Sequence, residues 1–174
     1  MKVIIEPCEI EGKVKAIESK SHAHRVLICA ELCDKETKVV CEEVSDDINA
    51  TIDCLRKLGA DITNVENGFI VKPIDLTNIK DNIEIDCMES GSTLRFLLPV
   101  VCSVDTNWEI YMRGRLPRRP LSPLYEELIS HGATISEQGI VPLKTSGGIK
   151  SGEYVLPANI SSQYISGLLF ALPL

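Results

Sequence analysis

The sequence predicts an α/β fold in which one unit, made of strand, helix, strand, helix and two further strands, is repeated. Three helix starts are alike, because small hydroxyl residues precede an apolar run at residues 19–32, 90–98 and 161–170. Residues 58–62 also match residues 131–135, at an offset of about 70 residues that the first two helix starts share. We therefore interpret the chain as two βαβαββ units and the start of a third.

Composition is that of an ordinary globular protein. The chain has 174 residues, of which 44% are hydrophobic and 25% are charged, so it can bury a core. A formal net charge of -7 disfavours bulk attraction to nucleic acid. Seven cysteines without a Cys-x-x-Cys pair, and an N-terminus unlike a signal peptide, favour the cytoplasm. Because no apolar run approaches the roughly 18 residues of a membrane span, we expect a small-molecule partner, no nucleic acid and no membrane.

The elements of the first unit follow from local patterns. Residues 1–5 and 12–17 alternate β-branched and charged side chains and predict short strands. The helix of residues 19–32 comes next, followed by a strand within residues 37–42. Asp46 or Asp47 is expected to cap a second helix that ends at Gly59. Its apolar residues recur at helical spacing, at Ile48, Ile52, Leu55 and Leu58.

A hairpin is expected to close the first unit. Residues 61–65 and 69–72 read as its two strands, and Asn67 with Gly68 favours a type I′ turn between them.

The second unit repeats this order. Its strands are expected at residues 84–87 and 108–112, its helices at 91–103 and 121–131, and its hairpin within 134–143. Pro99 lies inside the first of these helices, where it removes a hydrogen bond and should bend the axis. A strand at residues 152–156 then precedes the third helix start. Because the chain ends on the apolar run 168–174 without a polar tail, we expect it to be the front part of a longer protein.

Two basic clusters are candidates for anion binding. Lys20 and Arg25 flank the first helix start, where free backbone N–H groups and the helix dipole attract anions. The second cluster lies in residues 112–120, which we call the arginine loop; it holds Arg113, Arg115, Arg118 and Arg119, and no acidic residue follows Tyr111 before Tyr125. Guanidinium groups suit bidentate capture of carboxylate or phosphate. Solvated surface charge is the alternative interpretation of both clusters.

The sequence gives little support for a metal site or a catalytic nucleophile. Cys29 and Cys33 share a helix face among apolar neighbours, whereas His22 and His24 point in different directions. His131 before Gly132 suits a helix end without catalysis. The sequence has no Walker motif, no Rossmann glycine pattern and no nucleophile elbow. We therefore expect neither a metal nor a cofactor.

Four motifs in order resemble the 3-phosphoshikimate 1-carboxyvinyltransferases, the EPSP synthase family. They are Ser-Lys-Ser-x-x-x-Arg at residues 19–25, Glu-Ser-Gly-Ser-Thr-Leu-Arg at 89–95, Arg-Leu-Pro-x-Arg-Pro-Leu at 115–121 and Ser-Ser-Gln-Tyr-Ile-Ser-Gly-Leu-Leu at 161–169. The related UDP-N-acetylglucosamine enolpyruvyl transferases differ at these places. Two departures stand out, since many family members carry Pro-Gly where this chain has Ile17 and Glu18, and glutamate where it has Arg118.

The resemblance implies the enolpyruvyl transferase fold, with two lobes of three βαβαββ units each. Residues 1–17 would belong with the C-terminal lobe. Residues 18–174 would form an incomplete N-terminal lobe with units at about 18–83, 84–151 and 152–174. The implied reaction transfers the enolpyruvyl group of phosphoenolpyruvate to the 5-hydroxyl of shikimate 3-phosphate and releases phosphate. The complete enzyme would be a monomer, and this chain alone would be inactive without the missing lobe that holds the acid and base groups.

The resemblance also assigns site residues. Lys20 would be catalytic, by stabilising charge and relaying a proton. The residues implied to hold shikimate 3-phosphate are Lys20, Ser21, Arg25, Ser161, Ser162 and Gln163. Those implied to face phosphoenolpyruvate are Lys20, Gly91, Arg119 and Gln163, while Arg113 and Arg115 would mainly solvate the arginine loop. The alternatives are a module that binds a phosphorylated metabolite or RNA, and a structural piece with partial substrate affinity. With only 5% aromatic residues and an acidic balance, the RNA alternative is weak.

Overall fold

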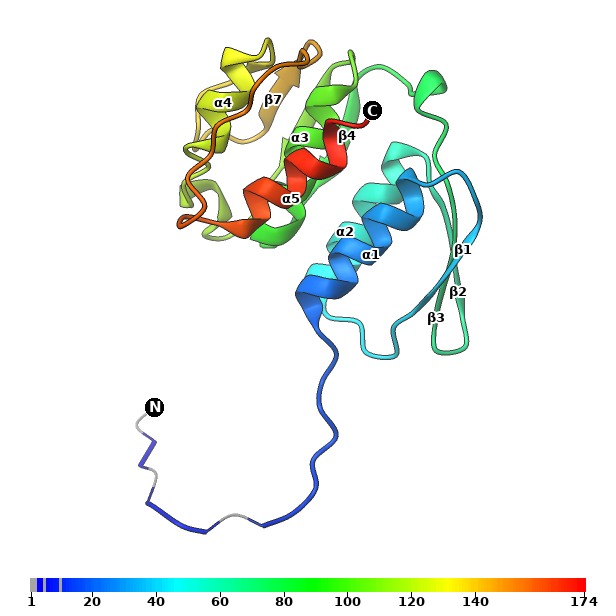
Figure 1. Ribbon diagram of the computed structural model, residues 1–174, viewed down its shortest axis with the longest axis vertical. Helices are drawn as coiled ribbons and strands as arrows, with labels where there is room; N and C mark the ends of the chain where they lie inside the picture. The colour runs from blue at the N-terminus through cyan, green and yellow to red at the C-terminus, as the bar shows by residue number, and fades with distance from the viewer. Residues whose placement is uncertain (1–2, 5, 10) are drawn as a thin grey trace.

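Five α-helices and seven strands alternate along the described part of the chain. The structure is a computed structural model that describes residues 3–4, 6–9 and 11–174 (Figure 1). The first unit comprises α1 (Lys20–Leu32), β1 (Thr37–Val40), α2 (Asp46–Leu58), β2 (Asp61–Val65) and β3 (Gly68–Lys72), followed by a 3-10 turn, η1 (Leu76–Asn78). The second comprises β4 (Ile83–Asp86), α3 (Gly91–Ser103), β5 (Trp108–Tyr111), η2 (Leu116–Arg118), α4 (Leu124–Ser130), β6 (Thr134–Ile135) and β7 (Leu143–Ser146), and α5 (Ser162–Ala171) follows.

The two sheets have the same connectivity, which confirms the predicted repeat. In the first sheet the strand order is β1-β3-β2, and in the second it is β4-β5-β7-β6. In both, the strand between the two helices of a unit pairs antiparallel with the last strand, which also pairs with the strand of its own hairpin. The second sheet has one strand more, because β4 pairs in parallel with β5.

The strands predicted at residues 12–17 and 152–156 do not form. Residues 12–17 are exposed and unpaired, and the strand expected at residues 1–5 falls partly on residues 1, 2 and 5, outside the described residues. An extended segment becomes a strand only beside a partner that completes its hydrogen-bond ladder, and residues 12–17 have none in the described chain. Residues 152–156 instead attach to α4 through side chains: the Val155 N–H donates to Glu127 Oε1 (2.7 Å), and Tyr154 stacks on His131 with ring centroids 3.7 Å apart.

Helix and turn boundaries also differ in detail. The N-cap of α2 is Ser45, whose Oγ accepts from the Ile48 N–H, so Asp46 and Asp47 occupy the first turn rather than the cap. The C-cap Gly59 has φ +119°, as its expected role requires. The β2–β3 loop is Glu66 and Asn67, of which only Asn67 has positive φ, so the type I′ prediction was wrong. Helix α4 begins at Leu124, three residues later than predicted, and the Leu121 N–H donates to Gln138 Oε1.

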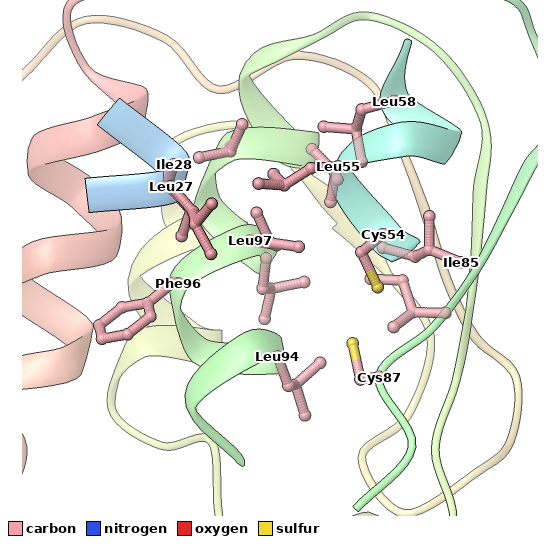
Figure 2. Packing of buried hydrophobic residues seen from close by; sticks show 14 of the residues in the cluster. Leu27, Ile28, Cys54, Leu55, Leu58, Ile85, Cys87, Leu94, Phe96 and Leu97 are labelled. Atoms are coloured by element: carbon pink, nitrogen blue, oxygen red, sulfur yellow. The ribbon is translucent and has the colours of Figure 1, made fainter. Parts of the chain in front are cut away.

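Both units contribute to one hydrophobic core. Figure 2 shows Leu27 and Ile28 of α1 and Leu55 of α2 facing Leu94 and Leu97 of α3, and all five are almost completely buried. The buried apolar residues of α2 and α5 recur at intervals of three and four, which explains why the sequence pattern predicted these helices, whereas α3 is buried on nearly all sides.

Helices α3 and α5 approach each other most closely at Pro99 and Gly167. A Cβ at Gly167 would stand 2.5 Å from the carbonyl oxygen of Arg95 and 3.0 Å from Pro99 Cγ. Pro99 has no N–H, so the Arg95 carbonyl lacks its usual partner four residues later, and α3 nevertheless continues to Ser103. A glycine opposite this carbonyl lets the backbones of the two helices touch.

No described helix has both the length and the apolar character needed to cross a membrane.

Candidate functional site

The N-termini of α1, α3 and α5 lie on one side of the molecule, where the three helices run in the same direction (Figure 1). Ser90 and Ser161 act as N-caps of α3 and α5, since their hydroxyl oxygens accept from the N–H groups of Thr93 and Gln163. Ser19 occupies the corresponding position before α1 without a side-chain cap. The remaining N–H groups of these first turns are available to an anion.

Lys20 forms an ion pair with α2 rather than with either of the other helix starts. Its Nζ lies 2.5 Å from Asp47 Oδ2, and both side chains remain partly exposed. Sequence reasoning treated Asp47 only as a helix-start charge and so missed this pair. The ion pair with Asp47 places the Lys20 ammonium group at the edge of the first helix start, where a ligand can reach it.

Arg25 joins the first and third helix starts. Its Nε donates to Ser166 Oγ of α5 (3.1 Å), and its Nη1 donates to the carbonyl of Ser21 (2.8 Å). The guanidinium carbon also lies 4.7 Å from the ring centre of Phe96 on α3. One side chain therefore contacts all three helices, so its planar group has a defined position at their meeting point.

The second and third helix starts meet through Gln163. Its Oε1 accepts from Arg95 Nη1 (3.0 Å), and its Nε2 donates to Ser92 Oγ (2.8 Å). Gly91 is buried beside them, and a Cβ there would lie 3.1 Å from Arg119 Nη1 and 3.6 Å from Arg95 Nη1. Three of the residues assigned to phosphoenolpyruvate, Gly91, Arg119 and Gln163, are thus brought together. Arg95 is a fourth group at this place, which sequence reasoning quoted only as part of a motif.

The arginine loop divides into paired and unpaired guanidinium groups. Arg113 Nη2 and Nε lie 2.6 and 2.9 Å from Asp86 Oδ2 of β4, an ion pair that the prediction of a mainly solvated Arg113 did not include. The Arg115 backbone N–H donates to Glu89, while its side chain is exposed. Among the residues the structure describes, Arg118 and Arg119 form no ion pair. The sequence could not reveal the Asp86 contact, because the two residues are distant along the chain.

A buried chain of hydroxyl groups supports the N-terminus of α3. His24 Nδ1 on α1 lies 2.7 Å from Thr51 Oγ1 on α2, which lies 2.7 Å from Thr93 Oγ1 on α3; Thr93 in turn donates to Ser90 Oγ at 2.7 Å. All four residues are buried. Burial lowers the pKa of His24 to about 4, so the imidazole is neutral at pH 7. Sequence reasoning missed this network, because it had placed no helix beside another.

A cavity of about 760 Å³ adjoins these helix starts but has the wrong charge for an anion. It lies between α2 and the ends of β4 and β5, and its acidic lining consists of Asp46, Asp47, Asp53, Glu84, Asp86 and Glu89. Lys57 and Arg113 also line it. None of the residues predicted to bind the substrates lines this cavity. Within the described residues no group of three or more His, Cys, Asp or Glu side chains is placed to hold a metal ion.

Fold and site together define a class of protein: repeated βαβαββ units whose helix starts lie on one side and carry cationic side chains. The chain belongs to the EPSP synthase (3-phosphoshikimate 1-carboxyvinyltransferase) family, whose model matches residues 5–174.

Known proteins similar to this chain agree with that assignment. The 3-phosphoshikimate 1-carboxyvinyltransferase of Clostridium beijerinckii is 45% identical over 177 residues, covering 98% of this chain and 41% of the relative. That of Clostridium perfringens is 41% identical over 174 residues, with 99% and 41% covered. The chain therefore spans about two fifths of the length of these curated relatives.

Solved structures share the fold. The EPSP synthase of Acinetobacter baumannii superposes with a TM-score of 0.78 at 25% identity, covering 92% of this chain and 37% of that one. The enolpyruvyl transferase NikO of Streptomyces tendae gives a TM-score of 0.56 at 13% identity, with 91% and 37% covered, and bears on the fold alone. The predicted fold class is thereby confirmed.

Proposed function

We propose that the protein carrying this chain transfers the enolpyruvyl group of phosphoenolpyruvate to the 5-hydroxyl of shikimate 3-phosphate, with release of phosphate. The observation that carries the proposal is the cluster at Gly91, where the guanidinium groups of Arg95 and Arg119 approach a bare backbone beside Gln163. Two planar cations at a helix N-terminus suit a small ligand that carries both a carboxylate and a phosphate. Membership of the family supplies the identity of that ligand.

The first and third helix starts are proposed to hold shikimate 3-phosphate. Ser21, Ser161 and Ser162 lie at these two starts, which Arg25 joins by its hydrogen bond to Ser166. Lys20 and Gln163 then lie at the border between the two substrates. Residues 18–174 are proposed to form the lobe that presents these groups, while residues 1–17 pair with a second lobe.

The reaction needs proton transfers at the 5-hydroxyl and at C3, and this chain offers one group for them. Oxygen of the 5-hydroxyl attacks C2 of phosphoenolpyruvate and loses its proton as C3 is protonated, which gives a tetrahedral adduct. Loss of a C3 proton and of phosphate from C2 then forms the enolpyruvyl ether. We propose that Lys20 stabilises the anionic charge and relays a proton, with Asp47 holding its ammonium group in place. The other acid and base groups are assigned to the second lobe, and we further propose a cytoplasmic monomer.

Phosphate release from the complete protein tests the assignment. Release that requires both substrates, with formation of the enolpyruvyl ether, is the expected result. The Lys20→Met variant should lower kcat by roughly 100-fold or more, as loss of a general acid–base group does. Lys35→Met is the matched control, because Lys35 is exposed beyond the other end of α1. Phosphate release without shikimate 3-phosphate, or an unchanged kcat in Lys20→Met, would contradict the proposal.

A further inference from the structure

Tyr164 is a buried aromatic residue in the first turns of α5, next to Gln163. Its side chain is 3% exposed, and its hydroxyl donates to the backbone carbonyl of Pro120 at 2.9 Å. Pro120 directly follows Arg119 in the arginine loop, 44 residues away along the chain. A single hydroxyl therefore joins the third helix start to the loop that carries Arg119.

This hydrogen bond restrains the backbone on the C-terminal side of Arg119. On the N-terminal side, the Arg119 N–H donates to the carbonyl of Leu116 at 3.0 Å, and Leu116 is buried. The next residue, Leu121, donates its N–H to Gln138 at 3.0 Å. The Arg119 side chain is exposed, so these main-chain contacts, together with the fixed φ of Pro120, define where its guanidinium group can reach.

The ring of Tyr164 acts on a second guanidinium group of the same cluster. The guanidinium carbon of Arg95 lies 5.6 Å from the ring centre, within the range of a cation–π contact. Arg95 also donates to Gln163 and, like Arg119, approaches Gly91. Tyr164 consequently contacts the guanidinium group of Arg95 directly and, through the Pro120 carbonyl, the backbone next to Arg119.

We propose that Tyr164 is a positioning residue for phosphoenolpyruvate, holding the arginine loop through its hydroxyl and Arg95 through its ring. This inference rests on the proposed function, which supplies the ligand of the two arginines. It predicts that removal of the hydroxyl alone weakens capture of phosphoenolpyruvate, because Arg119 then samples positions away from Gly91. Shikimate 3-phosphate, bound mainly at the first and third helix starts, should be little affected.

The Tyr164→Phe variant of the complete protein tests this with two measurements. Hydrogen–deuterium exchange should be faster at the backbone amides of residues 116–121, whose loop has lost its hydrogen bond to α5. The KM for phosphoenolpyruvate should rise roughly 3- to 10-fold, the range for one hydrogen bond between neutral groups, with kcat and the KM for shikimate 3-phosphate within twofold of wild type.

Tyr125→Phe provides the matched control. The Tyr125 hydroxyl also contacts backbone carbonyls, those of Ile135 (3.3 Å) and Ser136 (3.1 Å), which lie outside the arginine loop. Its removal should leave the KM for phosphoenolpyruvate unchanged. An equal rise in both variants, or unchanged exchange in Tyr164→Phe, would overturn the proposal. If wild-type protein releases no phosphate, the proposed function fails, and the exchange rates alone decide whether Tyr164 holds the loop.

Discussion

Arg119 is the residue on which capture of phosphoenolpyruvate should depend most. Its guanidinium group lies over Gly91 and has no acidic partner among the described residues, whereas Arg113 is neutralised by Asp86. Arg119→Ala should lower kcat/KM for phosphoenolpyruvate by roughly 10- to 150-fold, the value of one hydrogen bond to a charged group. Arg119→Lys should recover little of this loss, because an ammonium group lacks the planar fork.

Steady-state kinetics with phosphoenolpyruvate varied at saturating shikimate 3-phosphate would measure the effect. Arg115→Ala serves as the control within the same loop, since the Arg115 side chain is exposed. Wild-type behaviour of Arg119→Lys would mean that the loop acts only as diffuse positive charge. Greater damage from Arg115→Ala would mean that the bidentate role belongs to Arg115.

Glu31 is a buried carboxyl group whose charge should destabilise the fold. It is completely buried on α1, neither oxygen has a hydrogen-bond partner in the described chain, and burial raises its pKa well above the usual value. A raised pKa in the folded state stabilises the protein below pH 4.5, and this contribution is lost as the pH rises. Glu31→Gln should therefore raise the free energy of unfolding at pH 8 by roughly 1–3 kcal/mol, and by less at pH 4.5.

Urea unfolding at several pH values would show the difference between wild type and Glu31→Gln. Glu66→Gln, in the exposed β2–β3 loop, is the control and should show no such pH-dependent gain. A loss of stability in Glu31→Gln at pH 8 would indicate that the carboxylate has a favourable role in the fold.

At the scale of elements, sequence reasoning was most successful for helices. The apolar spacing in α2 and the hydroxyl residues before α3 located both helices to within a residue or so, because a helix satisfies its own backbone hydrogen bonds. Strands were less predictable, since a strand depends on its partner. Residues 152–156 were predicted as a strand, but their environment provides Glu127 and His131 rather than a ladder.

Contacts between elements were the part of the site that the sequence could not supply. The motifs identified Lys20, Gly91, Arg119 and Gln163 through resemblance, but nothing in the sequence indicates that Asp47 pairs with Lys20. The His24 network illustrates the same limit, because each of its residues comes from a different helix or cap.

The His24 network should make the three-helix packing sensitive to acid. The lowered pKa of His24 means that its stabilising contribution is fully present above about pH 6.5 and is lost as the pH falls through about 4. The loss amounts to roughly 3 kcal/mol for a shift of this size. His24→Gln stays neutral throughout, so its unfolding free energy should fall less than that of wild type between pH 7 and pH 4.

Unfolding by urea along a pH series would test this. His22→Gln is the control on the exposed face of the same helix and should retain the wild-type slope. A slope in His24→Gln equal to that of wild type would show that other groups account for the acid sensitivity. Thr51→Val, which removes the middle hydroxyl, should destabilise the protein at every pH.

For the molecule as a whole, catalysis should require more than these 174 residues. The chain matches about two fifths of its curated relatives, and family resemblance assigns the remaining acid and base groups to a second lobe. A single lobe also leaves the helix starts open to water, which weakens electrostatic stabilisation of charged intermediates. The isolated chain should therefore show no phosphate release above background. The complete protein assayed at the same concentration is the control, and clear turnover by the isolated chain would refute the expectation.

The close packing of Gly167 against Arg95 and Pro99 sets how near α3 and α5 can approach each other. Because the backbones of α3 and α5 already touch, these helices cannot move closer together, and a larger residue at position 167 would force them apart. The distance between the second and third helix starts is consequently set by main-chain atoms rather than by adjustable side chains. The spacing of these two helix starts thus depends on a glycine that lies outside the cluster at Gly91.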